Sequence, residues 1–242
     1  MIRVLDQIHS EILALYPGYC WGKVLCWDID NARSTEPAKR SLREVETLAR
    51  STPDLEEIAT DARVAAWRDA FSAFGARPSK FQSSVEALAR RARRGDELPA
   101  VNLLVGLYNA ASLRYLMPVG GDDLALVQGG LHLRRAAGGE PYLELGTGLS
   151  APALPGEIVY TDDARVLCRR WCWRQSNDTK ITQSTRAAVL NLHGLPPVSR
   201  DEVKSATREL AELVTRECGG QARWYVLDRE TPSRELNADG LT

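Results

Sequence analysis

The order of the hydrophobic patterns along the chain constrains its fold most, because helical spacing dominates the first part and strand-like runs dominate the later part. Apolar residues at helical spacing predict helices over 2–16, 36–50, 54–74, 80–94 and 100–115, with one early strand at 20–29. Strand-like runs between Gly and Pro clusters follow at 131–135, 142–145, 158–162, 166–173 and 187–192. Helices followed by strands predict an α+β domain, with a largely antiparallel sheet flanked by helices.

The clearest element signal lies near the end of the chain. Ser199 and Glu202 have the spacing of a capping box, and an apolar stripe at helical spacing follows them. A closing strand is expected at 222–227. Residues 229–242 are polar and without periodicity, which predicts a disordered tail. No repeat or long linker divides 1–228, so we expect one domain there.

Composition excludes several classes of protein. The chain has 242 residues, 44% of them hydrophobic, so it can bury a core, and its net charge of -1 gives no general attraction to DNA or membranes. The most apolar stretch, 101–119, is too polar for a membrane span, and acidic residues near the start argue against a signal peptide. We therefore expect a cytoplasmic protein that meets any polyanion through a local patch.

The residues of common catalytic devices are sparse. Five scattered cysteines predict reduced thiols, and their spacing does not fit a zinc site. The three histidines, His9, His132 and His193, do not stand beside a Ser or Cys nucleophile, and no phosphate-binding or dinucleotide loop is present in the sequence. We expect neither a metal nor another cofactor, and the oligomeric state stays open.

A first candidate cluster spans the end of the helix predicted at 100–115 and the loop expected after it. Two polar residues share a helical face, two glycines allow close backbone approach to a ligand, and two carboxylates can bind a cation or orient water. The members are Asn109, Ser112, Gly120, Gly121, Asp122 and Asp123. A plain helix end with a glycine turn and solvated acids explains the same spacing equally well.

A second cluster covers 169–175. Alternation on a strand would place Arg170, Cys172 and Arg174 on one face, with Trp171 and Trp173 on the other. One face would then be basic and the other aromatic. The alternative is a half-buried edge strand with its tryptophans in the core.

A third feature is a basic stretch over 77–94, with six Lys and Arg residues against the single acid Glu86. It predicts a patch that contacts the phosphate backbone of tRNA. The candidate contacts are Lys80, Arg90, Arg91, Arg93 and Arg94. Cations at the negative end of a helix dipole explain part of this pattern as well.

Taken in order, these motifs resemble a known family. The stretch NAASLRYLMPVGGDDL (109–124), the Gly129-Gly130 turn into LHLRRA, residues 155–162 and CRRWCWRQSNDTKIT (168–182) are similar to freestanding B3/B4-domain proteins. These proteins are relatives of the editing module in the β subunit of bacterial phenylalanyl-tRNA synthetase. The similarity covers roughly residues 10 to 195.

The resemblance implies an α/β-type editing fold that hydrolyses the ester at the acceptor end of a misacylated tRNA. One branch of the freestanding proteins is known as canavanyl-tRNA(Arg) deacylases, and this chain has about the compact length of that branch. The Tyr108-Asn109 pair matches a Thr-Asn pair of the synthetase module. Gly120 stands where that module has its editing-site histidine, and Gln175 falls near its later glutamate. Both departures argue against tyrosine, which the synthetase module rejects, as the amino acid recognised here.

The resemblance also suggests roles for the clusters. We expect the amides of Gly120 and Gly121 to face the carbonyl group, and Asn109 and Gln175 to hold water or the α-amino group. Acidic residues would pair with a cationic amino-acid side chain, and a tryptophan would stack on the terminal base. These are Asp122 and Asp123, with Glu157 and Asp178 as secondary acids, and Trp171 or Trp173. The alternative is a non-catalytic module that binds tRNA ends or an amino-acid-like metabolite.

Overall fold

The computed structural model describes residues 3–51 and 58–237. Its helices are α1 (Ser10–Leu15), α2 (Glu36–Ser51), α3 (Ala62–Ala73), α4 (Ser84–Arg93), α5 (Leu103–Tyr115) and α6 (Arg200–Cys218), with a short 3-10 helix at Leu124–Leu126. Its strands are β1 (Arg3–Ile8), β2 (Cys20–Trp27), β3 (Val119–Asp123), β4 (Leu131–Arg135), β5 (Ile158–Thr161), β6 (Val166–Arg169), β7 (Arg174–Gln175), β8 (Ala188–Gly194), β9 (Gln221–Leu227) and β10 (Ser233–Asn237).

The strands form two sheets rather than the single sheet that the sequence predicted. One has the order β10-β1-β4-β5-β6-β7, and the other has the order β3-β8-β2-β9. Among the described strands, β1 and β4 are parallel, and the other pairs are antiparallel. The predicted α+β class, with mainly antiparallel pairing and flanking helices, is confirmed.

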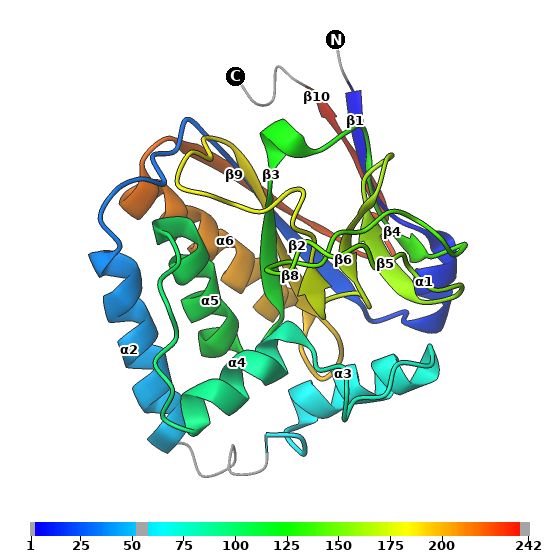
Figure 1. Ribbon diagram of the computed structural model, residues 1–242, viewed down its shortest axis with the longest axis horizontal. Helices are drawn as coiled ribbons and strands as arrows, with labels where there is room; N and C mark the ends of the chain where they lie inside the picture. The colour runs from blue at the N-terminus through cyan, green and yellow to red at the C-terminus, as the bar shows by residue number, and fades with distance from the viewer. Residues whose placement is uncertain (1–2, 52–57, 238–242) are drawn as a thin grey trace.

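Helices cover one face of the four-stranded sheet. Helix α6 packs on β2 and β9, α5 packs on α6, and α2 and α4 pack against α5, as Figure 1 shows. The apolar face of α6 that the sequence predicted, including Leu210 and Val214, lies in this core with Val24 of β2. Its capping box forms as predicted, because the Ser199 side chain accepts from the Glu202 N–H while Glu202 accepts from the Ser199 N–H.

The opposite face of the same sheet packs against the six-stranded sheet. This second core is rich in aromatic side chains, and it includes Trp21 of β2, Tyr160 of β5 and Trp67 of α3. Strand β2 is therefore buried on both faces, which explains why its residues are all buried. The candidate site lies where the two sheets and helices α4 and α5 meet.

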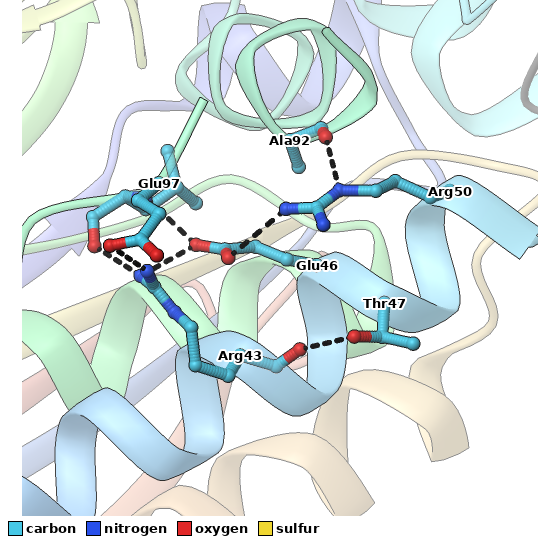
Figure 2. A network of polar contacts seen from close by, with 7 residues as sticks. Arg43, Glu46, Thr47, Arg50, Ala92 and Glu97 are labelled. Atoms are coloured by element: carbon cyan, nitrogen blue, oxygen red, sulfur yellow. Dashed lines mark hydrogen bonds and ion pairs between the residues drawn. The ribbon is translucent and has the colours of Figure 1, made fainter. Parts of the chain in front are cut away.

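A buried carboxylate ties α2 to the segment between α4 and α5. Glu46 is 1% exposed and accepts hydrogen bonds from Arg43 at 2.9 Å and from the Leu98 N–H at 2.8 Å. Figure 2 shows Arg50 on its other side, where Arg50 also donates to the Ala92 carbonyl of α4 at 3.1 Å. The network holds together three segments that the sequence pattern treats as separate.

Both ends of the chain differ from the sequence expectation. The predicted helix at 2–16 is instead strand β1 followed by the short helix α1. The predicted disordered tail at 229–242 contains strand β10 in its described part, antiparallel to β1. Strands β1 and β10 lie side by side (Figure 1). Each strand supplies the backbone partners of the other, and a local sequence pattern does not reveal that pairing.

Candidate functional site

A cavity of about 360 Å³ collects residues from α4, α5, β3 and β8 on one side and from β5, β6 and β7 on the other. Six of the predicted site residues from the first two clusters line it: Asn109, Gly120, Gly121, Asp122, Trp173 and Gln175. Arg91 of the basic stretch completes the predicted residues at its wall. A larger hollow of about 470 Å³ between α2, α5 and α6 contains no predicted site residue.

The two glycines lie in strand β3, where the sequence predicted a loop. A Cβ atom added to Gly120 would meet nothing within 4 Å, whereas one added to Gly121 would stand 2.5 Å from Leu190 Cδ2. Gly120 therefore leaves open space in the cavity, and Gly121 permits close packing of β3 on β8. Residues 119–123 form a strand rather than the predicted loop because they pair along their length with β8.

The backbone N–H groups of Gly120 and Gly121 point in opposite directions. Strand β3 is the edge of its sheet, and the Gly121 carbonyl accepts a hydrogen bond from the Gln175 side chain on the open side. The N–H and C=O of one residue in an antiparallel strand point the same way, and neighbouring residues alternate. The Gly121 N–H thus points to the open edge, while the Gly120 N–H points toward β8. The expectation that both amides face a ligand is corrected for Gly120.

Asp122 is the buried acid of the cavity. Its Oδ1 accepts hydrogen bonds from Thr179 Oγ1 at 2.6 Å and from Gln175 Nε2 at 3.0 Å. Its Oδ2 accepts none from the described residues. Burial raises the pKa of Asp122 to about 7, against the stabilising effect of these donors and of nearby Lys23. Asp122 can therefore exchange a proton or ionise for a cationic ligand near neutral pH.

Two side-chain amides complete this part of the wall. Gln175 Nε2 donates to both Asp122 and the Gly121 carbonyl, which leaves its Oε1 as an acceptor for water or an amine. Asn109 reaches the cavity from α5 and makes no side-chain hydrogen bond to the part of the chain that the structure describes. The arrangement offers acceptors and donors around the open space at Gly120.

The sequence analysis missed several cavity residues that lie inside apolar strands. Asn191 on β8, Tyr160 on β5 and His193 on β8 all line the cavity, and fully buried Lys23 lies behind Asn191. The available signal was isolated polar residues within an otherwise apolar run, as Asn191 and His193 are in Ala188–Gly194. A buried polar residue in such a run needs a partner or a function.

His193 is held neutral and is already engaged. Burial, together with nearby Lys23, lowers its pKa to about 3. Its Nδ1 is 2.7 Å from the Tyr19 hydroxyl, and its ring stacks on Trp21. Among the described residues, the hydrogen-bond partner of the His193 ring is thus Tyr19, and not a Ser or Cys nucleophile.

The structure does not bring five of the predicted residues into the cavity. Ser112 donates to the Met117 carbonyl, Asp123 accepts from Thr185 and the Ala125 N–H, and Glu157 pairs with Arg169. Asp178 lies 3.8 Å from Arg165. Trp171 is 0% exposed and packs edge-on against Tyr16, Tyr19 and Trp67, so it cannot stack on a base.

The predicted strand at 166–173 ends early, which changes the face pattern of the second cluster. Strand β6 stops at Arg169, and Arg170 and Trp171 have positive φ angles of 47° and 63° in the turn before β7. The expected alternation of basic and aromatic residues is therefore wrong. Trp173 remains half-buried at the cavity, edge-on to Phe81 and beneath the Arg170 guanidinium.

The basic stretch at 77–94 is only partly free for a polyanion. Arg90 binds buried Glu86 at 2.9 Å, and Arg93 donates to the carbonyls of Ala49 and Arg50 at the end of α2. Lys80 lies outside α4, which begins at Ser84, and it is exposed. The cations that face outward or toward the cavity are Arg77, Lys80, Arg91 and Arg94, the last 3.2 Å from Asp96.

Neither a metal-binding cluster nor a membrane-spanning helix occurs in the described part of the chain. Within 3–51 and 58–237, no three or more His, Cys, Asp or Glu side chains gather in a way that could hold a metal ion. Among the helices in those ranges, none is long and apolar enough to cross a membrane.

The family comparison agrees with the resemblance seen in the sequence. The model of the B3/4 domain family matches residues 66–219, which include every residue that lines the cavity. Among solved structures, an N-terminal fragment of the phenylalanyl-tRNA synthetase beta-subunit from Pyrococcus horikoshii is similar at 12% identity and a TM-score of 0.45. That likeness covers 91% of this chain and 50% of the fragment, so the chain spans about half of the fragment's length. No curated protein matches the chain.

Proposed function

This chain belongs to the B3/4 domain family, and from that premise we propose that it is an aminoacyl-tRNA deacylase that edits in trans. The observation that carries the proposal is the cavity in which Asn109, Asp122 and Gln175 surround the open space at Gly120. Its volume of about 360 Å³ suits an aminoacyl group at the end of a longer ligand. The rest of the tRNA would lie outside it.

The reaction requires little of the protein. Water adds to the ester carbonyl carbon, the bond from that carbon to the ribose oxygen breaks, and a water proton ends on the ribose oxygen. The Gln175 and Asn109 amide oxygens would hold the water or the α-amino group, and the Gly121 N–H would face the carbonyl from the free edge of β3. The neighbouring ribose hydroxyl can carry the proton, and water is the nucleophile, so no nucleophilic side chain and no catalytic triad are needed.

Asp122 defines the substrate class that we propose. A buried carboxylate with one unoccupied oxygen favours a cationic or guanidino group, which supports canavanyl-tRNA(Arg) as the substrate. Ionisation of Asp122 would accompany binding, because a cation in contact lowers the pKa that burial has raised. Half-buried Trp173 would stack on the terminal base or on a planar guanidino group.

The test is hydrolysis of a panel of misacylated tRNAs, including canavanyl-tRNA(Arg), arginyl-tRNA(Arg) and tyrosyl-tRNA(Phe), followed by loss of the ester. We expect canavanyl-tRNA(Arg) to be hydrolysed fastest. Asp122→Asn should raise its KM about tenfold or more, consistent with loss of a charge-assisted bond. Asp123→Asn is the matched control, since Asp123 is adjacent in sequence and lies outside the cavity.

A non-catalytic module is the second candidate, and the same cavity supports it. Binding of uncharged tRNA or of a free amino acid, with no ester lost from any member of the panel, would favour that function and overturn the deacylase. Equal KM values for Asp122→Asn and the parent protein on canavanyl-tRNA(Arg) would overturn only the proposed substrate class.

A further inference from the structure

A row of paired residues crosses the four-stranded sheet at the floor of the cavity. Gly120 of β3 pairs with Asn191 of β8, Asn191 with Lys23 of β2, and Lys23 with Tyr225 of β9. Directly paired residues point to the same face of a sheet. This face is the one buried against the six-stranded sheet, and its edge opens into the cavity at Gly120.

The centre of the row is a buried positive charge. Lys23 is 0% exposed, and its Nζ lies 2.7 Å from Asn191 Oδ1 and 3.2 Å from Asp6 Oδ2. It also lies 3.6 Å from the centre of the Trp21 ring. The Tyr225 hydroxyl donates to the same Asp6 oxygen at 2.6 Å. A fully buried ammonium is costly even when it is paired, so its position behind the cavity wall calls for an explanation.

Lys23 determines how the Asn191 amide is turned. An ammonium group only donates hydrogen bonds, so the Asn191 oxygen must face Lys23. The Asn191 NH₂ group is then turned away from Lys23, and it has no acceptor at hydrogen-bonding geometry within the described residues. Asn191 thus reaches the cavity as a donor of fixed orientation.

Tyr160 supplies a second unused donor beside the first. Its ring lines the cavity from β5, 2% of the residue is exposed, and its hydroxyl has no hydrogen-bond partner in the described part of the chain. Burial holds the pKa of Tyr160 well above its ordinary value, so the hydroxyl stays protonated. The Asn191 amide approaches this hydroxyl as a donor and lowers its pKa, against the larger effect of burial, although the two groups do not reach hydrogen-bonding geometry. One ligand oxygen placed between the two groups would accept from both.

We propose that the Asn191 amide and the Tyr160 hydroxyl bind the carbonyl oxygen of the ester in this cavity, with Lys23 as the residue that positions Asn191. The inference rests on the proposed deacylase function, and it assigns the site for the oxygen that becomes negative when water adds.

Tyr160→Phe is the sharpest variant, because it removes one oxygen that has no hydrogen-bond partner among residues 3–51 and 58–237. We expect its thermal stability to equal or exceed that of the parent, while kcat for ester hydrolysis falls about 100-fold, as for loss of one oxyanion donor. Asn191→Asp keeps an acceptor for Lys23 and removes the donor, and it should lower kcat to a similar extent. Tyr16→Phe, outside the cavity, is the matched control.

The positioning role of Lys23 is tested by a double-mutant cycle. Lys23→Met combined with Asp6→Asn removes both buried charges together, and it should lower kcat about tenfold in the parent. In an Asn191→Leu background the same pair should have no further effect on kcat, since Lys23 acts through Asn191. A merely structural role would give the same loss in both backgrounds and would contradict the positioning.

A second readout separates this inference from the proposed function. An adenosine that carries the amino acid through an amide keeps the carbonyl oxygen and is not hydrolysed. Calorimetry should show it binding about five- to tenfold more weakly to Tyr160→Phe and to Asn191→Asp than to the parent. If the parent hydrolyses no ester, the deacylase proposal fails and this binding result alone decides the oxygen site. Unchanged kcat in both variants, unchanged analogue binding, or no analogue binding to the parent would overturn the inference.

Discussion

The buried carboxyl group of Asp122 lowers the stability of the folded state at neutral pH, and it leaves an ionisable group in the cavity. Its side chain is buried with two hydrogen-bond donors on one oxygen, yet its pKa lies at about 7 because burial outweighs those donors. In the unfolded chain the same carboxyl would ionise near its ordinary value of about 4. Between these two values the folded state holds a proton that the unfolded state releases.

We expect Asp122→Asn to stabilise the protein, and the gain to depend on pH. A carboxyl whose folded pKa is raised loses stability as pH rises from the unfolded pKa to the folded one. The advantage of the Asn variant should therefore grow from about pH 4 to about pH 7 by roughly 4 kcal/mol and then level off. Urea unfolding at several pH values measures it. A gain independent of pH would show that Asp122 has an ordinary pKa.

The two adjacent glycines of β3 should respond differently to a methyl group. Gly120→Ala places Cβ in open space, so we expect a Tm within about 2 °C of the parent and weaker binding of aminoacyl ligands. Gly121→Ala meets Leu190 at 2.5 Å and should destabilise the fold by about 1 to 3 kcal/mol. Calorimetry of both variants tests this, and a large Tm loss for Gly120→Ala would contradict the open space.

At the level of elements, the Glu46 network joins α2, α4 and the segment before α5 (Figure 2). Glu46→Leu leaves the Leu98 N–H without its acceptor and removes one carboxylate partner from Arg43, which keeps the Leu98 carbonyl and Glu97. We expect a loss of about 3 kcal/mol, or a Tm lower by about 10 °C in a chain of this size. Glu44→Leu is the control, since Glu44 is 67% exposed and lies 3.6 Å from Arg114. Similar losses for the two variants would contradict the special role of Glu46.

Elements with strong local signals were predicted well. The strand at 131–135 has the predicted bounds, and α6 begins at the predicted capping box. Prediction was wrong where distant pairing decides the structure. Residues 3–8 have apolar spacing that also suits a helix, but β4 and β10 make them a strand. Residues 119–123 carry the glycines and acids of a loop, but they pair with β8.

At the level of the whole molecule, the neutral net charge leaves only local patches for a polyanion. We expect Lys80→Gln, Arg91→Gln and Arg94→Gln together to weaken tRNA binding. A plot of log K against log salt has a negative slope, and its magnitude should decrease by about 0.9 for each phosphate that is no longer neutralised. Filter binding over a salt series measures the slope. The matched control is the triple variant Lys204→Gln, Arg208→Gln and Arg216→Gln on α6. Equal slopes for the two triple variants would exclude phosphate contacts by Lys80, Arg91 and Arg94.

The sequence by itself determined the fold class, the family and part of the cavity wall. Periodicity and caps are local, and the motifs around Asn109, Gly120, Asp122 and Gln175 are contiguous enough to be recognised. The second sheet, the burial of Trp171 and the row from Gly120 through Asn191 to Lys23 depend on the tertiary structure. Residues that are far apart in sequence become neighbours there only through strand pairing, which fixes their burial, their partners and the pKa of Asp122.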